Sequence, residues 1–202
     1  MVNSETMKSA DNINIQLALP AHAEYAEFIC SLYAASAKER GTGIAKRQPD
    51  YVKAKILKGD AVVAFDGDQL AGFCYIETWS HGQYVANSGL IIAPDYRRKG
   101  LARRIKQQVF KLARDKYPNA RVFGITTSLA VMRINSDLGY KPVTFSELTQ
   151  DDAFWNGCKS CPNFDILERN ERKLCLCTAM LAPSKEEQMA FDLSHQIIAQ
   201  QH

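Results

Sequence analysis

The sequence contains no long hydrophobic run. No stretch approaches the roughly 18 consecutive apolar residues that suggest a membrane-spanning helix. Residues 1–12 are polar and lack the apolar core of a signal peptide. We therefore expect a cytoplasmic protein with no membrane partner. Internal repeats and low-complexity segments are missing as well.

A large excess of charge of one sign is also missing. The 202 residues carry a formal net charge of +3, and the positive charge is concentrated in residues 97–116. A surface for single-stranded nucleic acid interleaves basic and aromatic residues, and aromatic residues do not alternate with this cluster. A phosphate-rich cofactor explains the basic cluster more simply than a nucleic acid does, so we expect no nucleic-acid partner. The oligomeric state is not fixed by the sequence, which leaves a homodimer open.

The composition itself is typical of a globular domain. Hydrophobic residues make up 46% of the chain and charged residues 23%, and a chain of this length can bury a core without disulfides or metal. We predict a disordered leader over residues 1–12 and a single domain over residues 13–202.

Apolar periodicity predicts a mixed α/β order of elements. Alternation indicates a strand at residues 13–17, and the apolar stripe of a helix follows at Tyr25, Phe28, Ile29, Leu32 and Tyr33. The later elements are a helix at 51–57, strands at 61–65, 70–79 and 84–93, a helix from 101 to Pro118, a strand at 121–127, a helix at 129–138 and strands at 143–148 and 174–181.

Two features of this order constrain the fold. Three consecutive antiparallel strands precede the first glycine turn into a helix, which is not the alternating order of a Rossmann domain. The strand at 121–127 should be parallel to the strand at 84–93, because a helix crosses between them. Ser184 and Glu187 have the spacing of a capping box and predict a C-terminal helix.

Residues 90–102 are the stretch around which the chain is organised. An apolar strand stops at Pro94, a short basic turn follows, and a helix starts near Gly100. Unpaired backbone N–H groups converge at a helix N-terminus, where the helix dipole favours an anion. Gly100 lacks a Cβ, so a phosphate can approach the backbone there. The alternative is a β–α turn with a solvated basic patch.

The spacing Arg97-x-x-Gly100-x-Ala102 resembles the pyrophosphate-binding motif Q/R-x-x-G-x-G/A of the GNAT superfamily of acyl-CoA N-acyltransferases. The resemblance implies the GNAT fold, a mixed and mostly antiparallel twisted sheet flanked by helices, over residues 13–181. It also implies acetyl-CoA or another acyl-CoA as co-substrate. In that family the turn holds the pyrophosphate and the preceding strand pairs with the pantetheine arm. The expected coenzyme site is Ile91, Ile92, Arg97, Arg98, Lys99, Gly100, Leu101 and Ala102.

A second resemblance concerns residues 124–127 and 139–143, which are similar to the acyltransferase domain of bacterial N-acetylglutamate synthases. It implies a small amino acid as acceptor, glutamate-like and linked to arginine biosynthesis, with acetyl or succinyl as the acyl group. The alternative to this resemblance is that residues 139–143 are simply the end of a helix followed by a strand. Many GNAT enzymes protonate the leaving thiolate with a Tyr on the short helix, where this chain has Asn135. Asn135, directly or through water, or Tyr140 is the candidate for that role.

Acyl transfer to an amine also needs a group that receives the proton of the amine. Glu77 is the candidate base and His81 a second one. The alternatives are that Glu77 points to solvent from an edge of the sheet and that His81 caps a loop. A carboxylate on the acceptor calls for the planar fork of Arg. Arg47, beside Lys46 in the loop that borders the acceptor site of GNAT enzymes, is the first candidate and Arg133 the second. A solvated loop is the alternative for Lys46 and Arg47.

Four cysteines bracket a Cys-rich insertion at about residues 151–173. They are Cys158, Cys161, Cys175 and Cys177. A structural zinc site of four thiolates is one interpretation, with the last two cysteines on one face of a strand. Reduced structural thiols are the other, and disulfides are disfavoured in the expected compartment.

Two classes of function follow. The first is an acyl-CoA-dependent N-acyltransferase with a small-molecule amine as substrate. The second is a non-catalytic acyl-CoA-binding sensor, in which Asn135 marks a lost acid and the Cys-rich insertion makes a partner surface.

Overall fold

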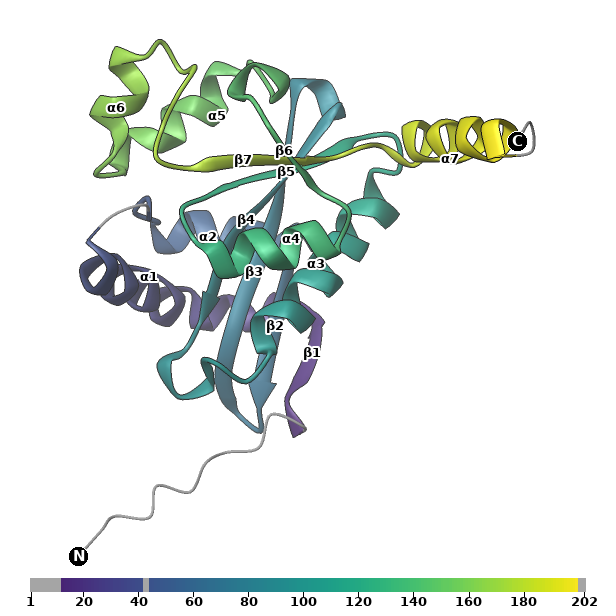
Figure 1. The fold of residues 1–202 in the computed structure, drawn as a ribbon. Coiled ribbons are helices and arrows are strands. Elements are labelled where there is room, and N and C mark those ends of the chain that lie inside the picture. Colours follow the sequence, from purple (N-terminus) through teal and green to yellow (C-terminus); the bar gives the residue numbers. More distant parts are fainter. Residues whose placement is uncertain (1–11, 42–43, 200–202) are drawn as a thin grey trace, which may run out of the picture.

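A computed structural model describes residues 12–41 and 44–199. The predicted leader, apart from Asn12, therefore lies outside the described residues. The centre of the fold is a seven-stranded sheet with the spatial order β1-β2-β3-β4-β5-β7-β6 (Figure 1). In chain order the strands are β1 (Asn14–Leu17), β2 (Ala61–Asp66), β3 (Gln69–Trp79), β4 (Tyr84–Ile92), β5 (Arg121–Thr126), β6 (Lys141–Val143) and β7 (Thr178–Ala182).

The strand pairing confirms the predicted mixed, mostly antiparallel sheet. All neighbouring strands run antiparallel except β4 and β5, which are parallel. A helix connects these two strands, and such a crossover is what parallel neighbours require. The predicted order of elements from residue 13 to residue 181 is therefore correct.

Helices cover both faces of the sheet. In chain order the helices of the described residues are α1 (Ala26–Arg40), α2 (Pro49–Leu57), α3 (Leu101–Lys116), α4 (Leu129–Asp137), α5 (Asp152–Asn156), α6 (Phe164–Arg169) and α7 (Lys185–Ala199). A Cβ on Gly72 of β3 would meet Ile105 of α3 at 2.6 Å, whereas the Tyr75 ring lies beside Tyr33 of α1 at Gly89. Residues three apart on a strand point to opposite faces, so α3 and α1 cover opposite sides (Figure 1).

The main core lies between the sheet and these helices. The apolar stripe of α3 is buried as predicted, at Leu101, Ile105, Val109 and Leu112. Burial of this stripe against the sheet supplies most of the helix stability, since an isolated helix of this length is marginal in water. Of the stripe predicted for α1, Ile29, Leu32 and Tyr33 are buried and Phe28 is exposed, while Tyr25 precedes the helix and is half-buried.

Two strand predictions were wrong in extent. The strand expected at residues 143–148 shares only Val143 with β6, which lies earlier in the chain, and a 3-10 turn at Phe145–Glu147 follows. The Thr144 amide there donates to Glu147 Oε1 at 3.0 Å, which stops the strand by turning the chain. The strand expected at residues 174–181 begins only at Thr178.

The insertion between β6 and β7 folds around its own small core. It contains α5, a 3-10 turn at Gly157–Ser160, and α6, and it lies beyond β7 at one end of the molecule (Figure 1). Trp155 is fully buried in a cluster with Phe145, Leu148 and Leu167, and its Nε1 donates to the Thr149 carbonyl at 2.9 Å. Apolar burial therefore holds the insertion on the sheet.

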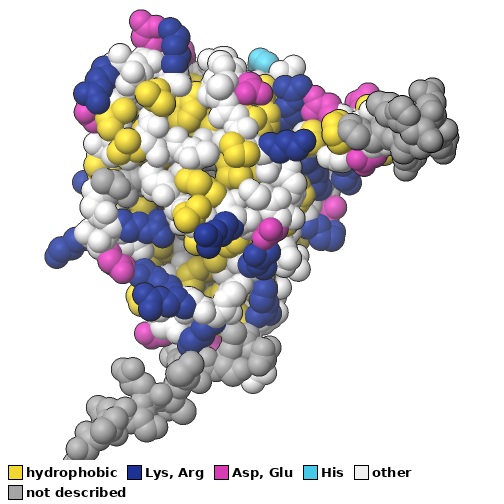
Figure 2. Space-filling model, viewed as in Figure 1, with side chains coloured by type: hydrophobic (Ala, Val, Ile, Leu, Met, Phe, Trp, Pro, Cys, Tyr) yellow, Lys and Arg dark blue, Asp and Glu magenta, His cyan; other side chains and the backbone are white. Residues whose placement is uncertain are grey.

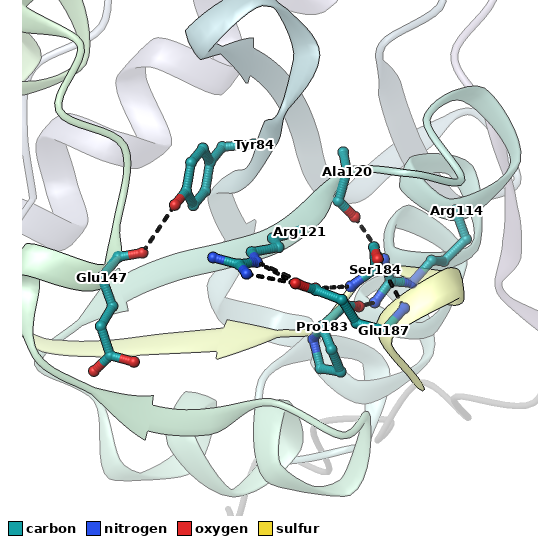
Figure 3. Close-up of polar contacts among 8 residues, drawn as sticks. All are labelled: Tyr84, Arg114, Ala120, Arg121, Glu147, Pro183, Ser184 and Glu187. Atoms are coloured by element: carbon teal, nitrogen blue, oxygen red, sulfur yellow. Dashed lines mark hydrogen bonds and ion pairs between the residues drawn. The ribbon is translucent and has the colours of Figure 1, made fainter. Parts of the chain in front are cut away.

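The C-terminal helix starts with the predicted capping box. The Glu187 amide donates to Ser184 Oγ at 3.1 Å, and the Ser184 amide donates to Glu187 Oε2 at 2.9 Å. Arg121 of β5 forms an ion pair with Glu187, and Arg114 of α3 donates both to the Ala120 carbonyl at 2.9 Å and to the Pro183 carbonyl just before α7 (Figure 3). These contacts tie α7 to the sheet, although the helix itself projects from the body (Figure 1). No helix within the described residues is long and apolar enough to cross a membrane.

Candidate active site

A gap opens in the sheet where β4 and β5 separate. The two strands pair over three positions only, and the last pair is Ala86 with Phe123. Beyond it β4 continues beside β3 and β5 beside β7. Edge backbone groups of β4 and β5 consequently face each other across the gap without pairing, and such groups can bind an extended ligand. Ile91 and Ile92 lie on this stretch of β4.

A β-bulge in β4 produces the separation. Phe73 pairs with Ile91 but Tyr75 pairs with Ser88, so β4 has one residue more than β3 in this interval. Gly89 in the bulge has φ of 65°, and a Cβ there would lie 2.1 Å from the Tyr75 ring. Both the backbone angle and the close ring require glycine.

The turn between β4 and α3 has the predicted form of an anion site. Arg98 and Gly100 adopt positive φ, 63° and 75°. No side chain caps the N-terminus of α3 and no acidic residue lies in its first turn, so its first N–H groups and the dipole can serve an anion. A Cβ on Gly100 would point into open space. Leu101 and Ala102 begin the helix at the same point.

The basic side chains of this turn have different partners. Arg97 donates to the Ile92 carbonyl at 3.2 Å and to Ser36 at 3.0 Å, and it pairs with Glu39 at 2.6 Å. It therefore fixes the turn against α1. Lys99 donates to a backbone carbonyl at 2.8 Å and does not line the cavity described below. Other Lys and Arg side chains gather around the start of α3 in the lower half of Figure 2.

One cavity of about 1070 Å³ connects the turn, the gap and the insertion. This is the size of a site for a cofactor and a small molecule. It brings together most of the residues that the sequence singled out: Lys46, Arg47, Glu77, Ile91, Ile92, Arg97, Arg98, Gly100, Leu101, Ala102, Arg133, Asn135 and the four cysteines of the insertion. Lys99, Tyr140 and His81 do not line it.

The loop after α1 places Arg47 at the α1 side of the sheet. Arg47 Nε donates to Tyr75 at 2.7 Å and Nη1 to the Ala45 carbonyl at 2.9 Å. Among the described residues Nη2 has no hydrogen-bond partner, so it is available to a ligand. The Lys46 amide donates to Ser160 at 3.1 Å, which joins this loop to the insertion, while the Lys46 side chain is exposed.

Glu77 lies near Arg47 on the same face of β3, but it has partners of its own. Lys55 of α2 is 3.0 Å from its carboxylate, and Tyr51 donates a short hydrogen bond to it. The Glu77 side chain is only 10% exposed. This carboxylate is thus held in a fixed position beside the cavity.

Asn135 lies on α4 where the gap begins. A Cβ on Gly124, the first β5 residue beyond the last pair with β4, would be 3.9 Å from Asn135 Nδ2 and 3.5 Å from the Asn87 carbonyl. Asn87 Nδ2 in turn donates to Tyr140 Oη at 3.5 Å. Tyr140 is 2% exposed, and burial raises the pKa of its hydroxyl. Tyr140 therefore lies behind the residues that line the cavity.

Buried polar atoms without a partner mark the same cavity. Among the described residues there are three such side-chain atoms: Trp79 Nε1, Asn135 Oδ1 and Asn163 Nδ2. All three residues line the cavity. Because an unpaired buried polar atom is costly, a bound ligand is the natural partner. Trp79 and Asn163 were missed from the sequence, since neither belongs to a motif.

The four cysteines, interpreted from the sequence either as a zinc site or as reduced thiols, all line the cavity. Among the described residues no three His, Cys, Asp or Glu side chains come together as metal ligands. The last two cysteines precede β7 and are not on a strand. All four are free thiols, three of them packed against the core of the insertion. Burial and the neighbouring thiols raise the pKa of Cys158 to about 11 and that of Cys177 to about 12.

Comparison with known proteins agrees with this geometry. Residues 27–130 match the model of the acetyltransferase (GNAT) family. The chain therefore belongs to this family of acyl-CoA-dependent N-acyltransferases. No curated protein matches the chain.

Solved structures show the same fold at low identity. N-acetylglutamate synthase from Neisseria gonorrhoeae, complexed with coenzyme A and N-acetyl-glutamate, has a TM-score of 0.62 at 16% identity; the match covers 87% of this chain and 35% of that one. Rv2747 from Mycobacterium tuberculosis, in complex with CoA, has a TM-score of 0.59 at 15% identity, over 84% and 98%. The ribosomal-protein-S18-alanine N-acetyltransferase from Escherichia coli has 0.54 at 11%, over 85% and 93%.

These likenesses establish the fold alone. The present chain spans about a third of the length of the Neisseria enzyme. Since structures named for an amino acid and for a ribosomal protein share the fold, the acceptor has to be argued from this site.

Proposed function

We propose that this protein transfers an acyl group from acyl-CoA to the amine of a small amino acid. The observation that carries the proposal is the position of Arg47. It lines the cavity on the α1 side of the sheet, where Tyr75 and a backbone carbonyl orient its guanidinium and leave Nη2 available. A carboxylate is the ligand that such a group binds best.

The coenzyme would occupy the other part of the cavity. Its pyrophosphate fits the N-terminus of α3 at Gly100, and its pantetheine arm fits the gap beside Ile91 and Ile92. Acetyl-CoA and succinyl-CoA are the donors we consider, since they share the coenzyme portion that this path would hold.

The acceptor would lie between Arg47, Glu77 and the insertion. Glu77 would attract the ammonium group of an amino acid and receive its proton, directly or through water; its largely buried carboxylate beside the cavity supports this role. Asn135 is placed at the gap, where its free Oδ1 can accept a hydrogen bond from the reacting groups. An acidic amino acid of the glutamate type matches the cations Arg47, Lys46 and Arg133, and would link the reaction to arginine biosynthesis.

The test is release of free coenzyme A thiol with each donor across a panel of acceptors. Glutamate, glutamine, ornithine and γ-aminobutyrate form a matched set, because they differ in the presence of one carboxylate or amine. We expect turnover with α-amino acids and little with γ-aminobutyrate, which lacks the α-carboxylate. Turnover of γ-aminobutyrate equal to that of glutamate contradicts the proposed acceptor class. Binding of acyl-CoA without turnover of any acceptor supports the non-catalytic sensor instead.

A further inference from the structure

Lys106 is a buried lysine on α3 that the site described so far does not use. It is 2% exposed, although it lies on a helix whose buried face is otherwise apolar. No carboxylate pairs with it within residues 12–41 and 44–199. A buried ammonium without a carboxylate partner is costly to the folded state, which suggests that Lys106 has a function there.

The surroundings of Lys106 place it at the gap between β4 and β5. Its Nζ lies 5.7 Å from the centre of the Tyr140 ring, and Tyr140 contacts Asn87, the first β4 residue past the last pair with β5. We call Cys74, Asn87, Lys106, Asn135 and Tyr140 the fork cluster. Lys106 and the two asparagines line the cavity, whereas Cys74 and Tyr140 do not.

The fork cluster lies on the α3 side of the sheet, opposite Arg47 and Glu77. Gly72 and Cys74 share the face of β3 that meets α3, and Tyr75 and Glu77 share the other. A thioester in the gap would thus have the acceptor on one side and Lys106 on the other. That is the arrangement required of a group that serves the leaving sulfur and not the attacking amine.

We propose that the ammonium group of Lys106 gives its proton to the coenzyme A sulfur as the thioester bond breaks. This inference rests on the proposed function. The acceptor nitrogen forms a bond to the acyl carbon, the C–S bond breaks, and its electron pair stays on sulfur. Lys106 Nζ–H supplies the proton that converts the thiolate to the thiol. The neutral lysine then regains a proton from solvent, which balances the proton released by the acceptor amine.

The titratable groups of the fork cluster favour Lys106 for this step. Burial lowers the pKa of Lys106, with Cys74 acting in the opposite direction. A lowered pKa means that the ammonium loses its proton more readily than a surface lysine does. Burial raises the pKa of Cys74 to about 11, and it also raises that of Tyr140. Neither of these two groups reaches the cavity.

The first test is a titration of Lys106 that needs no acceptor. In protein labelled with ¹³C at lysine Cε, the Lys106 signal is assigned from Lys106→Met and followed against pH with coenzyme A and with desulfo-coenzyme A, which lacks the sulfur. We expect the pKa of Lys106 to be about one unit or more higher with coenzyme A, because a thiolate favours the ammonium. Identical titration in both complexes overturns the assignment. Failure to bind either ligand overturns the proposed function as well.

The second test compares kcat among three variants. Lys106→Met should fold normally, with a melting temperature at or above that of the natural protein, because an apolar side chain suits this face. Lys106→Arg keeps the charge but gives up its proton far less readily. We expect both to lose about 100-fold or more in kcat at an unchanged KM for acetyl-CoA. Exposed Lys111→Met is the control and should lose nothing. Full activity in Lys106→Arg, or loss of acetyl-CoA binding in Lys106→Met, overturns the proposal.

Discussion

Arg97 and Arg98 are adjacent, yet they contribute to the coenzyme turn in different ways. Arg97 points back to α1 and to β4, where Ser36, Glu39 and the Ile92 carbonyl hold its guanidinium. Arg98 has an exposed side chain and a backbone with φ of 63°. The motif arginine thus shapes the turn, and the backbone around Gly100 is left to hold the phosphates.

Gly100→Val should weaken binding of acyl-CoA. The valine side chain would enter the open space in front of α3, where a phosphate has to approach. We expect at least a tenfold loss of affinity, about 1.4 kcal/mol, measured by calorimetry with acetyl-CoA. Gly67→Val is the matched control, because Gly67 also has positive φ, has no neighbour within 4 Å of a Cβ and does not line the cavity. Equal loss in both variants would show that backbone strain alone is responsible.

Arg47→Ala should raise the KM for the acceptor and leave the KM for acyl-CoA nearly unchanged. A hydrogen bond to a charged group contributes about 1.5–3 kcal/mol, so an increase of tenfold or more is expected. Lys58→Ala is the control, since that side chain is exposed and does not line the cavity. A parallel rise in both KM values would instead point to coenzyme binding or folding.

At the scale of elements, the bulge of β4 is what opens the sheet. Gly89→Ala should close or distort it, because even a methyl group would overlap the Tyr75 ring and the backbone has φ of 65°. We expect a loss of unfolding free energy of about 2 kcal/mol or more, measured by denaturant titration, together with weaker binding of acyl-CoA. Gly59→Ala has a similar φ without the overlap and should lose less and bind normally.

The start of α7 depends on pH through Glu187. The hydrogen bond from Arg121 is the main reason that the pKa of Glu187 falls to about 2. A carboxyl group with a depressed pKa stabilises the fold above its unfolded value, near 4.5, and loses that contribution as pH falls toward 2. Since the Glu187 side chain is 40% exposed, the contribution is at most about 1 kcal/mol. Glu187→Gln should be less stable than the natural protein at pH 7 and equal to it near pH 2. An unchanged difference at both pH values would contradict the ion pair.

The elements also show where sequence reasoning works. The stripe of α3, the turn at Gly100 and the capping box of Ser184 and Glu187 were predicted because each depends on residues close in the chain. The late start of β7 was missed because the packing of the insertion determines where the strand begins. The bulge at Gly89 was missed because the need for glycine there comes from the ring of Tyr75, which is distant in the sequence. The unusual position of Lys106 could have been recognised in the sequence, because this lysine lies beside Ile105 and three residues before Val109 and so interrupts a buried apolar stripe.

At the scale of the whole molecule, the cavity has two ends with different chemistry. The start of α3 supplies backbone donors and cations for phosphates. The insertion, which lies beyond β7 (Figure 1), supplies aromatic rings, thiols and the unpaired Asn163 amide at the other end. The loop with Lys46 reaches the insertion through Ser160. Two segments that are distant in sequence therefore form one wall, which explains why the acceptor end could not be assembled from local patterns.

This arrangement predicts how the thiols of the insertion react. Because burial raises the pKa of Cys158 to about 11 and that of Cys177 to about 12, few thiolates are present at pH 7.5, and the thiolate is the nucleophile. Alkylation of Cys158 and Cys177 by iodoacetamide, followed by peptide mass spectrometry, should be slow at pH 7.5 and should accelerate about tenfold per pH unit up to pH 9.5. Modified protein should show a raised KM for the acceptor with little change for acyl-CoA, since the thiols line the acceptor end.

A chelator separates this prediction from the zinc interpretation. Thiolates bound to a zinc ion would react faster once the metal is removed, so EDTA should accelerate alkylation if zinc is present and leave it unchanged if the thiols are simply buried. We expect no change, because the insertion is held by the apolar cluster around Trp155. Cys158→Ser and Cys158→Ala distinguish a packing role of this residue from a role as a metal ligand. If Cys158 has only an apolar packing role, Cys158→Ala should be the more stable variant. Loss of the folded insertion in both variants, together with faster alkylation in EDTA, would instead support a bound zinc ion.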